Sequence, residues 1–209
     1  MPKPLRWLAL PLLGLLAMPI SANAATLVVF GTTSADASAT GILTLNGNVV
    51  NLSLTNTSAF DGRITGVGFD LAGGSGNSGL NGFTGSSTNA NFTFTDGELG
   101  NVPMFNSTVL DFGFTTGNNF NGGSPNNGID QLQTSNFSVI GNFGGFTESQ
   151  IASALFVRFQ RVGPNGEGGD VGVGQLVNTT PVPEPASMLL FGTGLAALAR
   201  RKLRQRKSA

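Results

Sequence analysis

The groups that could perform chemistry in this chain are carboxylates, because histidine and cysteine are both absent. Their absence excludes a Ser-His-Asp triad, a thiolate nucleophile and metal sites built from imidazole or thiolate. Two carboxylates can still hydrolyse a glycosidic bond, and Asp96 and Glu98 are close in sequence. However, Asp96-Gly97-Glu98 is typical of a turn with solvated side chains. We therefore predict that the protein is not an enzyme and has no cofactor, with glycoside hydrolysis as the third-ranked function.

A calcium ion is the next candidate, since hard cations bind carboxylate and carbonyl oxygens in loops. Residues 164–170, Pro-Asn-Gly-Glu-Gly-Gly-Asp, supply such oxygens. Their spacing does not match an EF-hand loop, and their composition is ordinary for a hairpin. We expect ion pairs instead, joining Arg158 or Arg161 to Glu167 or Asp170. No metal-ligating residue is predicted.

The formal charge of zero conceals an acidic body between two basic ends. Only Arg63, Arg158 and Arg161 are cationic between residues 25 and 184. All eleven carboxylates lie there, which gives this segment a formal charge of −8. Because an acidic segment without lysine cannot neutralise phosphates, we expect no nucleic-acid partner.

The N-terminus has the three parts of a secretory signal. Lys3 and Arg6 precede an apolar run at residues 7–20, and Ala22-Asn23-Ala24 follows with the small residues that signal peptidase accepts. Residues 1–24 are therefore predicted to be a signal peptide, cut after Ala24. A retained membrane helix is the alternative, but the run is short of the roughly 20 residues that a span needs.

Residues 25–180 are expected to form one domain, and about 150 residues can bury a core without disulfides. Apolar residues alternate with Asn, Ser and Thr over short runs, which predicts strands separated by Gly- and Asn-rich turns. The fold class predicted is all-β, an antiparallel β-sandwich or jelly roll.

The register of one hairpin follows from burial. A two-residue turn at Gly47-Asn48 pairs Leu45 with Val50 on one face, whereas a turn one residue earlier sets Leu45 against Asn48. We therefore predict the first register, although Asn-Gly is the commoner turn dipeptide.

Other local patterns predict a strand, a helix and two loops. Leu110, Phe112 and Phe114 should share a buried face, with Thr115 on the solvent side. A short helix should start after Thr147, where Gln150 completes a capping box, and end before residue 155. The stretches 72–90 and 116–128 are expected to be long surface loops, because Gly, Asn and Ser dominate them.

The C-terminus holds three parts in a fixed order. Val182-Pro183-Glu184-Pro185 is followed by an apolar run at 186–199 and by a basic cluster that begins with Arg200 and Arg201. Together they resemble the PEP-CTERM sorting domain, which we assign to residues 181–209. The resemblance implies that the membrane enzyme exosortase is a partner and processes the protein near the Pro-Glu-Pro element.

The composition of this tail explains how it would work. Prolines favour an extended approach, the apolar run forms a short transmembrane helix, and the cations stay cytoplasmic. A permanent anchor is the alternative. Yet the fourteen residues of 186–199 extend only about 21 Å as a helix, against a hydrocarbon core of about 30 Å. Membrane binding is therefore expected to be transient.

The resemblance also implies a setting, because such proteins accompany exopolysaccharide and biofilm production. We predict a secreted cell-surface protein with a structural or adhesive role in the extracellular matrix, and exopolysaccharide is a further expected partner. The runner-up function is a carbohydrate-binding module, with or without calcium. Against it, the body contains neither Trp nor Tyr, which commonly supply the flat faces on which sugars stack.

Removal of the signal peptide has an optical consequence. The chain has one tryptophan, Trp7, and no tyrosine, so protein cut after Ala24 should have almost no absorbance at 280 nm. Fluorescence of purified surface material checks this. A clear tryptophan emission band would show that residue 7 is retained.

Overall fold

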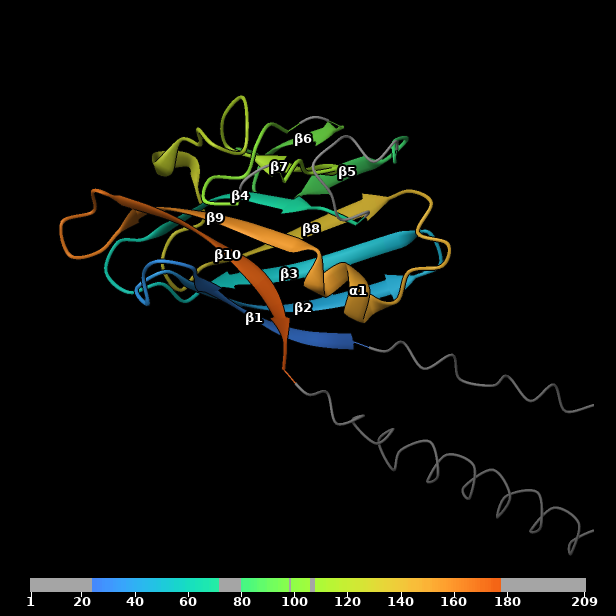
Figure 1. Cartoon of the computed structure of the whole chain (residues 1–209), viewed down its shortest axis with the longest axis horizontal. Helices are drawn as coiled ribbons and strands as arrows, with labels where there is room; N and C mark the ends of the chain where they lie inside the picture. Colours follow the sequence, from blue (N-terminus) through green and yellow to red (C-terminus); the bar gives the residue numbers. More distant parts are fainter. Residues whose placement is uncertain (1–23, 72–79, 98, 106–107, 178–209) are drawn as a thin grey trace, which may run out of the picture.

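A computed structural model describes residues 24–71, 80–97, 99–105 and 108–177 (Figure 1). Within these ranges no helix is both long and apolar enough to span a bilayer. The strands are β1 (Ala24–Gly31), β2 (Ser38–Asn46), β3 (Val49–Asn56), β4 (Arg63–Phe69), β5 (Thr84–Ser87), β6 (Thr93–Asp96), β7 (Phe112–Thr115), β8 (Thr134–Ile140), β9 (Leu155–Val162) and β10 (Gly168–Leu176). The helices are η1 (Pro125–Asn127) and α1 (Glu148–Ser153).

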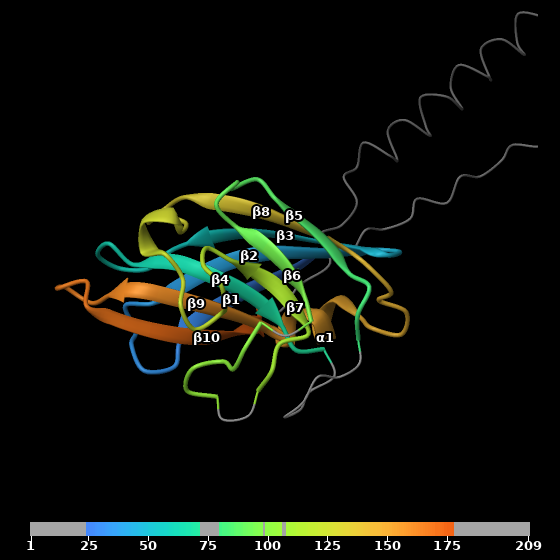
Figure 2. The ribbon, with the colours of Figure 1, turned by 90° about the horizontal axis from the view of Figure 1, so that it is seen from above.

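All ten strands belong to one antiparallel sheet, in the order β5-β8-β3-β2-β1-β10-β9-β4-β7-β6. The sheet curls until its edge strands β5 and β6 come into contact, and residues 88–92 connect them (Figure 2). The predicted all-β antiparallel fold is confirmed. The two layers are the two parts of this single sheet: the β1 half (β5-β8-β3-β2-β1) and the β10 half (β10-β9-β4-β7-β6).

The first and last strands of the domain lie side by side at the centre of the sheet. In the antiparallel pair β1 and β10, Leu27 is opposite Leu176 and Gly31 is opposite Gly172. This pair is the ladder through which the β1 half joins the β10 half. The start of β1 and the end of β10 therefore emerge at the same end of the domain (Figure 1).

The β2–β3 hairpin has the register that burial favours. Leu45 lies opposite Val50, and Gly47 and Asn48 form the two-residue turn, so this prediction is confirmed. Gly47 has a φ of +57°, a conformation that glycine adopts without strain. Alternate residues along both strands are buried, which is the pattern that fixed the register.

Phenylalanine rings connect the two halves across the interior. Phe137 of β8 contacts Phe114 of β7, with ring centroids 4.9 Å apart. Phe112 packs against Phe83, whose ring centroid is 4.3 Å away, and against Phe143. Because the described strands carry no disulfide, this burial of large apolar rings is the main source of stability.

A second, smaller apolar cluster covers the outer face of the β10 half. β4 and β7 are buried on both faces. Gly66 and Gly68 place no side chain on the outer face of β4. Phe120 and Leu110 therefore pack directly on the backbone there. A Cβ atom at Gly68 would collide with Leu110. Glycine is needed here because another layer of side chains approaches the backbone closely.

This cluster overturns the expected solvent exposure of Thr115. Its side chain is buried, and its hydroxyl donates a hydrogen bond to the carbonyl oxygen of Gly117 at 2.6 Å. The predicted burial of Leu110, Phe112 and Phe114 is confirmed, but Leu110 lies in the smaller cluster and the two phenylalanines in the main core. The strand has two buried faces because a loop folds over its outer side.

The two segments expected to be surface loops are more structured than predicted. Residues 116–128 bury Phe120 and include the η1 turn. The stretch 72–90 contains strand β5, which pairs with β8. Its short, small-residue sequence, Thr-Gly-Ser-Ser, gives no alternating apolar signal. Gly85 is required because Phe94 of β6 occupies the position that a side chain would fill.

Helix α1 confirms the predicted capping box. The Thr147 hydroxyl accepts a hydrogen bond from the Gln150 backbone N–H, and the Gln150 side chain accepts one from the Thr147 N–H at 2.9 Å. Ile151 and Ala152 are buried, and the helix packs against β10 and β1. The helix ends before Leu155, as expected.

Phe112 tests the main core. Phe112→Ala should lower the free energy of unfolding by about 3–5 kcal/mol, because it removes a ring that contacts aromatic side chains from both halves. Urea denaturation followed by far-UV circular dichroism measures this. Thr93→Ala, at an exposed position of β6, is the control and should change stability by less than about 0.5 kcal/mol. Equal small losses would contradict the assigned core.

Candidate functional site

The connections between strands gather at two opposite ends of the domain (Figure 1). The tail end holds the start of β1, the end of β10 and the β2–β3 turn. The other end holds residues 56–63, 128–133 and 163–167, which we call the distal loops. Pairing of Thr55 with Thr134 and of Arg63 with Gln160 brings these three segments together.

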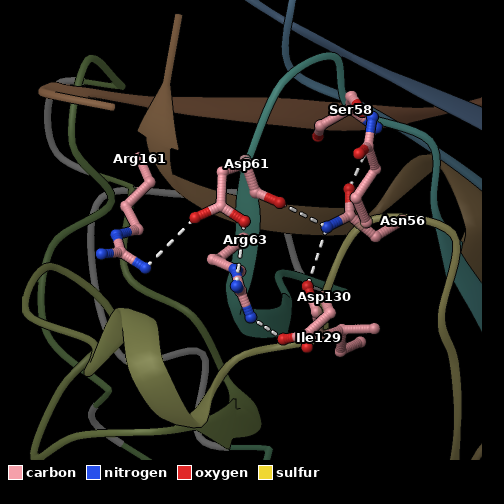
Figure 3. Close-up of polar contacts among 9 residues, drawn as sticks. Asn56, Ser58, Asp61, Arg63, Ile129, Asp130 and Arg161 are labelled. Atoms are coloured by element: carbon pink, nitrogen blue, oxygen red, sulfur yellow. Dashed lines mark hydrogen bonds and ion pairs between the residues drawn. The ribbon is translucent and has the colours of Figure 1, made fainter. Parts of the chain in front are cut away.

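Two of the three arginines of the domain lie in a charged cluster at the distal loops (Figure 3). Arg63 donates to Asp61 at 2.9 Å and also pairs with Asp130. Arg161 donates to the other Asp61 oxygen at 3.3 Å. Because these carboxylates are more than half exposed, the pairs orient the loops more than they stabilise the fold.

The predicted partner is wrong for Arg161, whereas Arg158 does contact Asp170, through its backbone. Arg161 binds Asp61 rather than Glu167 or Asp170, since pairing of β4 with β9 places the segment before β4 beside it. Arg158 donates a hydrogen bond to the backbone oxygen of Asp170 at 3.0 Å. Burial lowers the pKa of the Arg158 guanidinium, and the charge of Asp170 opposes that shift.

A buried amide holds two of the distal loops together. Asn56 donates to the carbonyl oxygens of Gly62 at 2.7 Å and Ile129 at 2.8 Å, and its own oxygen accepts from the Ser58 N–H (Figure 3). The side chain of Gln131 adds a bond to the Ser58 oxygen. The amide pairs the buried Gly62 oxygen and Ser58 N–H, and it links them to Ile129, whose oxygen also accepts from the Ile64 N–H.

Two apolar side chains project from the distal loops. Phe60 is 51% exposed and Leu132 is 74% exposed, and both have positive φ angles, +55° and +61°. Non-glycine residues rarely adopt this conformation, and strained positions cluster at binding surfaces. Sequence reasoning missed both residues, because neither lies in a periodic apolar pattern.

Asp170 is a structural carboxylate. It is fully buried and accepts backbone N–H bonds from Thr32, Thr33, Ser34 and Val171, the shortest at 2.7 Å from Ser34. Both oxygens are thus occupied in fixing the loop after β1. Nowhere in the described ranges do three or more acidic side chains gather as a metal site would require.

The candidate carboxylate pair cannot be assembled from the described residues. Asp96 ends β6 and accepts a hydrogen bond from the Gly82 N–H at 2.8 Å. Glu98 lies outside the described residues. This hydrogen bond has a structural role, because it links the segment before β5 to the end of β6.

Two hollows adjoin strand β8. The first, the loop groove, has a volume of ≈ 500 Å³ and lies between the β5–β6 connection and the segment 126–135. Its polar lining includes Asn89, Asn91, Asn126, Asp130, Gln133 and Thr134.

The second, the sheet hollow, has a volume of ≈ 460 Å³ and lies on the outer face of the β1 half. Its lining includes Ile42, Asn51, Ser53, Ser86, Asn136 and Ser138. Thr88 borders both hollows.

The outer face of the β1 half differs from the rest of the surface in its lack of charge. The five strands of this half contain no Asp, Glu, Lys or Arg. Their outward positions are mostly Ser, Thr and Asn, with Ile42 and Phe30 about half exposed. A domain of net charge −7 over residues 25–180 therefore has one broad neutral face.

The predicted processing residues fall almost wholly outside the described residues. These are Ala22 near the N-terminus and Val182, Pro183, Glu184, Pro185, Arg200 and Arg201 near the C-terminus. Ala24 is described, as the exposed first residue of β1. Cleavage after Ala24 would remove only this residue from the strand and leave Ala25 paired with Leu43.

Comparison with known proteins gives one match. Residues 181–205 match the PEP-CTERM protein-sorting motif, which follows shortly after β10. No curated protein and no solved structure matches the chain. The comparison therefore identifies the sorting motif of the tail. The role of the domain has to be inferred from its structure.

Asn56 tests how the distal loops are held. Asn56→Ala should lower the free energy of unfolding by about 2–4 kcal/mol, because the Gly62 oxygen and the Ser58 N–H lose their buried partner and the bond to Ile129 is lost. Chemical denaturation measures the change. Asn51→Ala, on the exposed face of the same strand, is the matched control and should have little effect. Comparable losses at both positions would contradict the network.

Proposed function

Because the chain carries a PEP-CTERM sorting motif, which implies an exported surface protein that exosortase processes, we propose that its domain is a structural or adhesive component of the extracellular matrix. In this proposal, signal peptidase removes residues 1–24 and the tail holds the protein transiently in the membrane. Exosortase then acts near Pro183-Glu184-Pro185. The motif at 181–205 is the observation that carries the proposal.

The geometry of the domain supports this order of events. β10 ends at Leu176, and eight residues reach from there to Glu184. A chain of that length spans at most about 29 Å, so the domain is held close to the membrane while the tail is inserted. The tail end then faces the membrane, and the distal loops, at the opposite end, face outward.

The proposed role needs no catalysis. The chain lacks histidine and cysteine, and Asp96 and Asp170 are engaged in backbone hydrogen bonds. What the domain offers instead is surface: a neutral sheet face, two hollows and exposed side chains at the distal loops. These are features of a binding or packing module.

Processing at the tail is tested by the mass of the mature protein. Intact-mass analysis of protein from the native host should find a C-terminus close to Pro185. In a strain without exosortase, the product should retain Arg200 and Arg201. If both strains yield protein that keeps residues 186–209, the tail is a permanent anchor and the proposal fails.

A matched pair of variants locates the signal. Replacing Pro183, Glu184 and Pro185 with alanine should leave export intact but keep the protein in the membrane fraction, because the sorting element is lost. Replacing Thr179 and Thr180 with alanine changes neighbouring residues outside the matched segment and should leave release unchanged. Fractionation followed by immunoblotting distinguishes the two outcomes.

A further inference from the structure

We infer that the loop groove and the sheet hollow together form one binding trough for a neutral polysaccharide chain. The inference rests on the proposed role as an exported surface module and names the chemistry of its partner. Both hollows fall within the volume range of about 300–1,000 Å³ that is typical of ligand sites.

The lining of the loop groove suits a ligand rich in hydroxyl groups. Asn89, Asn91, Asn126 and Gln133 each present an amide, which both donates and accepts hydrogen bonds. Thr134 adds a hydroxyl group, which shares one hydrogen bond with the Thr55 hydroxyl at 2.7 Å and can form another. Because every sugar hydroxyl is likewise a donor and an acceptor, such a lining can pair with several of them at once.

The charges exclude an acidic ligand. Among the described residues, Asp130 is the one charged side chain that lines the loop groove, and Arg63 neutralises it from outside the groove. No cation among the described residues lines either hollow, and residues 25–180 have a net charge of −7. A phosphate- or carboxylate-bearing polymer would therefore be repelled, whereas a neutral chain would not.

The two hollows adjoin each other, which favours an extended ligand. Thr88 borders both, and its position is fixed by two hydrogen bonds to the backbone of Asn136, each 2.9 Å long. In the sheet hollow, Asn51 and Asn136 supply further amides, and the exposed Ile42 provides an apolar surface for the C–H face of a sugar ring. A polymer can contact both hollows, while a single sugar cannot.

Binding should not require calcium. The carboxylate of Asp170, the best-placed acidic group of the candidate calcium loop, is saturated by backbone N–H groups. Of the described residues that line the trough, Asp130 is the one carboxylate, so a divalent cation would lack the several carboxylate ligands that it prefers. Binding is also expected to be weak per sugar, because no exposed aromatic ring lines the trough.

Affinity electrophoresis of the processed protein tests the inference. Gels would contain a neutral glucan, mannan or xylan, or the anionic polymers alginate or hyaluronan, with and without EDTA. We expect at least one neutral polymer to retard the protein, equally in EDTA, and the anionic polymers to have no effect. Retardation only by anionic polymers, or by none of the five, would overturn the inference.

Two double variants test the trough itself. Asn91→Ala with Gln133→Ala alters the loop groove, and Asn51→Ala with Asn136→Ala alters the sheet hollow. Each should weaken retardation at least fivefold, because a chain lying across both hollows loses contacts in either case. All four side chains are exposed, so the fold should persist, which thermal unfolding by circular dichroism verifies.

The control removes equivalent amides elsewhere. Asn118→Ala with Asn165→Ala alters two exposed amides outside both hollows and should leave retardation unchanged. An equal loss in the control, or retained binding in both trough variants, would overturn the inference. The intact mass shows whether each sample has been processed. If processing has failed, the full chain extracted in detergent can be tested in the same gels, so the binding result does not depend on the proposed processing.

Discussion

The antiparallel pairing of β1 with β10 is the interaction on which the rest of the domain depends. It joins the β1 half to the β10 half, and it uses the first and last strands of the described chain. Because β10 is hydrogen-bonded on both sides, the sheet cannot be completed until residue 176 is available for folding. The sorting motif follows shortly afterwards, at residues 181–205.

The same arrangement gives the two halves different surfaces. In the β10 half, glycines in β4 allow Leu110 and Phe120 to form a second apolar layer, and the charged residues of the strands lie in this half. The β1 half has no such cover, and its strands are free of charge. A neutral, hydroxyl-rich face thus remains open beside the loop groove.

The distal loops combine weak and strong restraints. The exposed ion pairs of Arg63 and Arg161 contribute little to stability, whereas the buried amide of Asn56 fixes the backbone of two loops. Phe60 and Leu132 are exposed with positive φ angles on these loops, at the end of the domain opposite the end of β10.

The sequence alone determined the features that depend on neighbouring residues: the strand character of the body, the hairpin turn at Gly47-Asn48, the capping box of α1 and the sorting motif. Each is encoded by local spacing, because side-chain alternation and capping act over a few residues. Only the tertiary structure decided that Asp170 binds the loop after β1, that Arg161 pairs with Asp61 and that Thr115 is buried. Those outcomes depend on strands distant in sequence that become neighbours, and local periodicity carries no information about which strands pair.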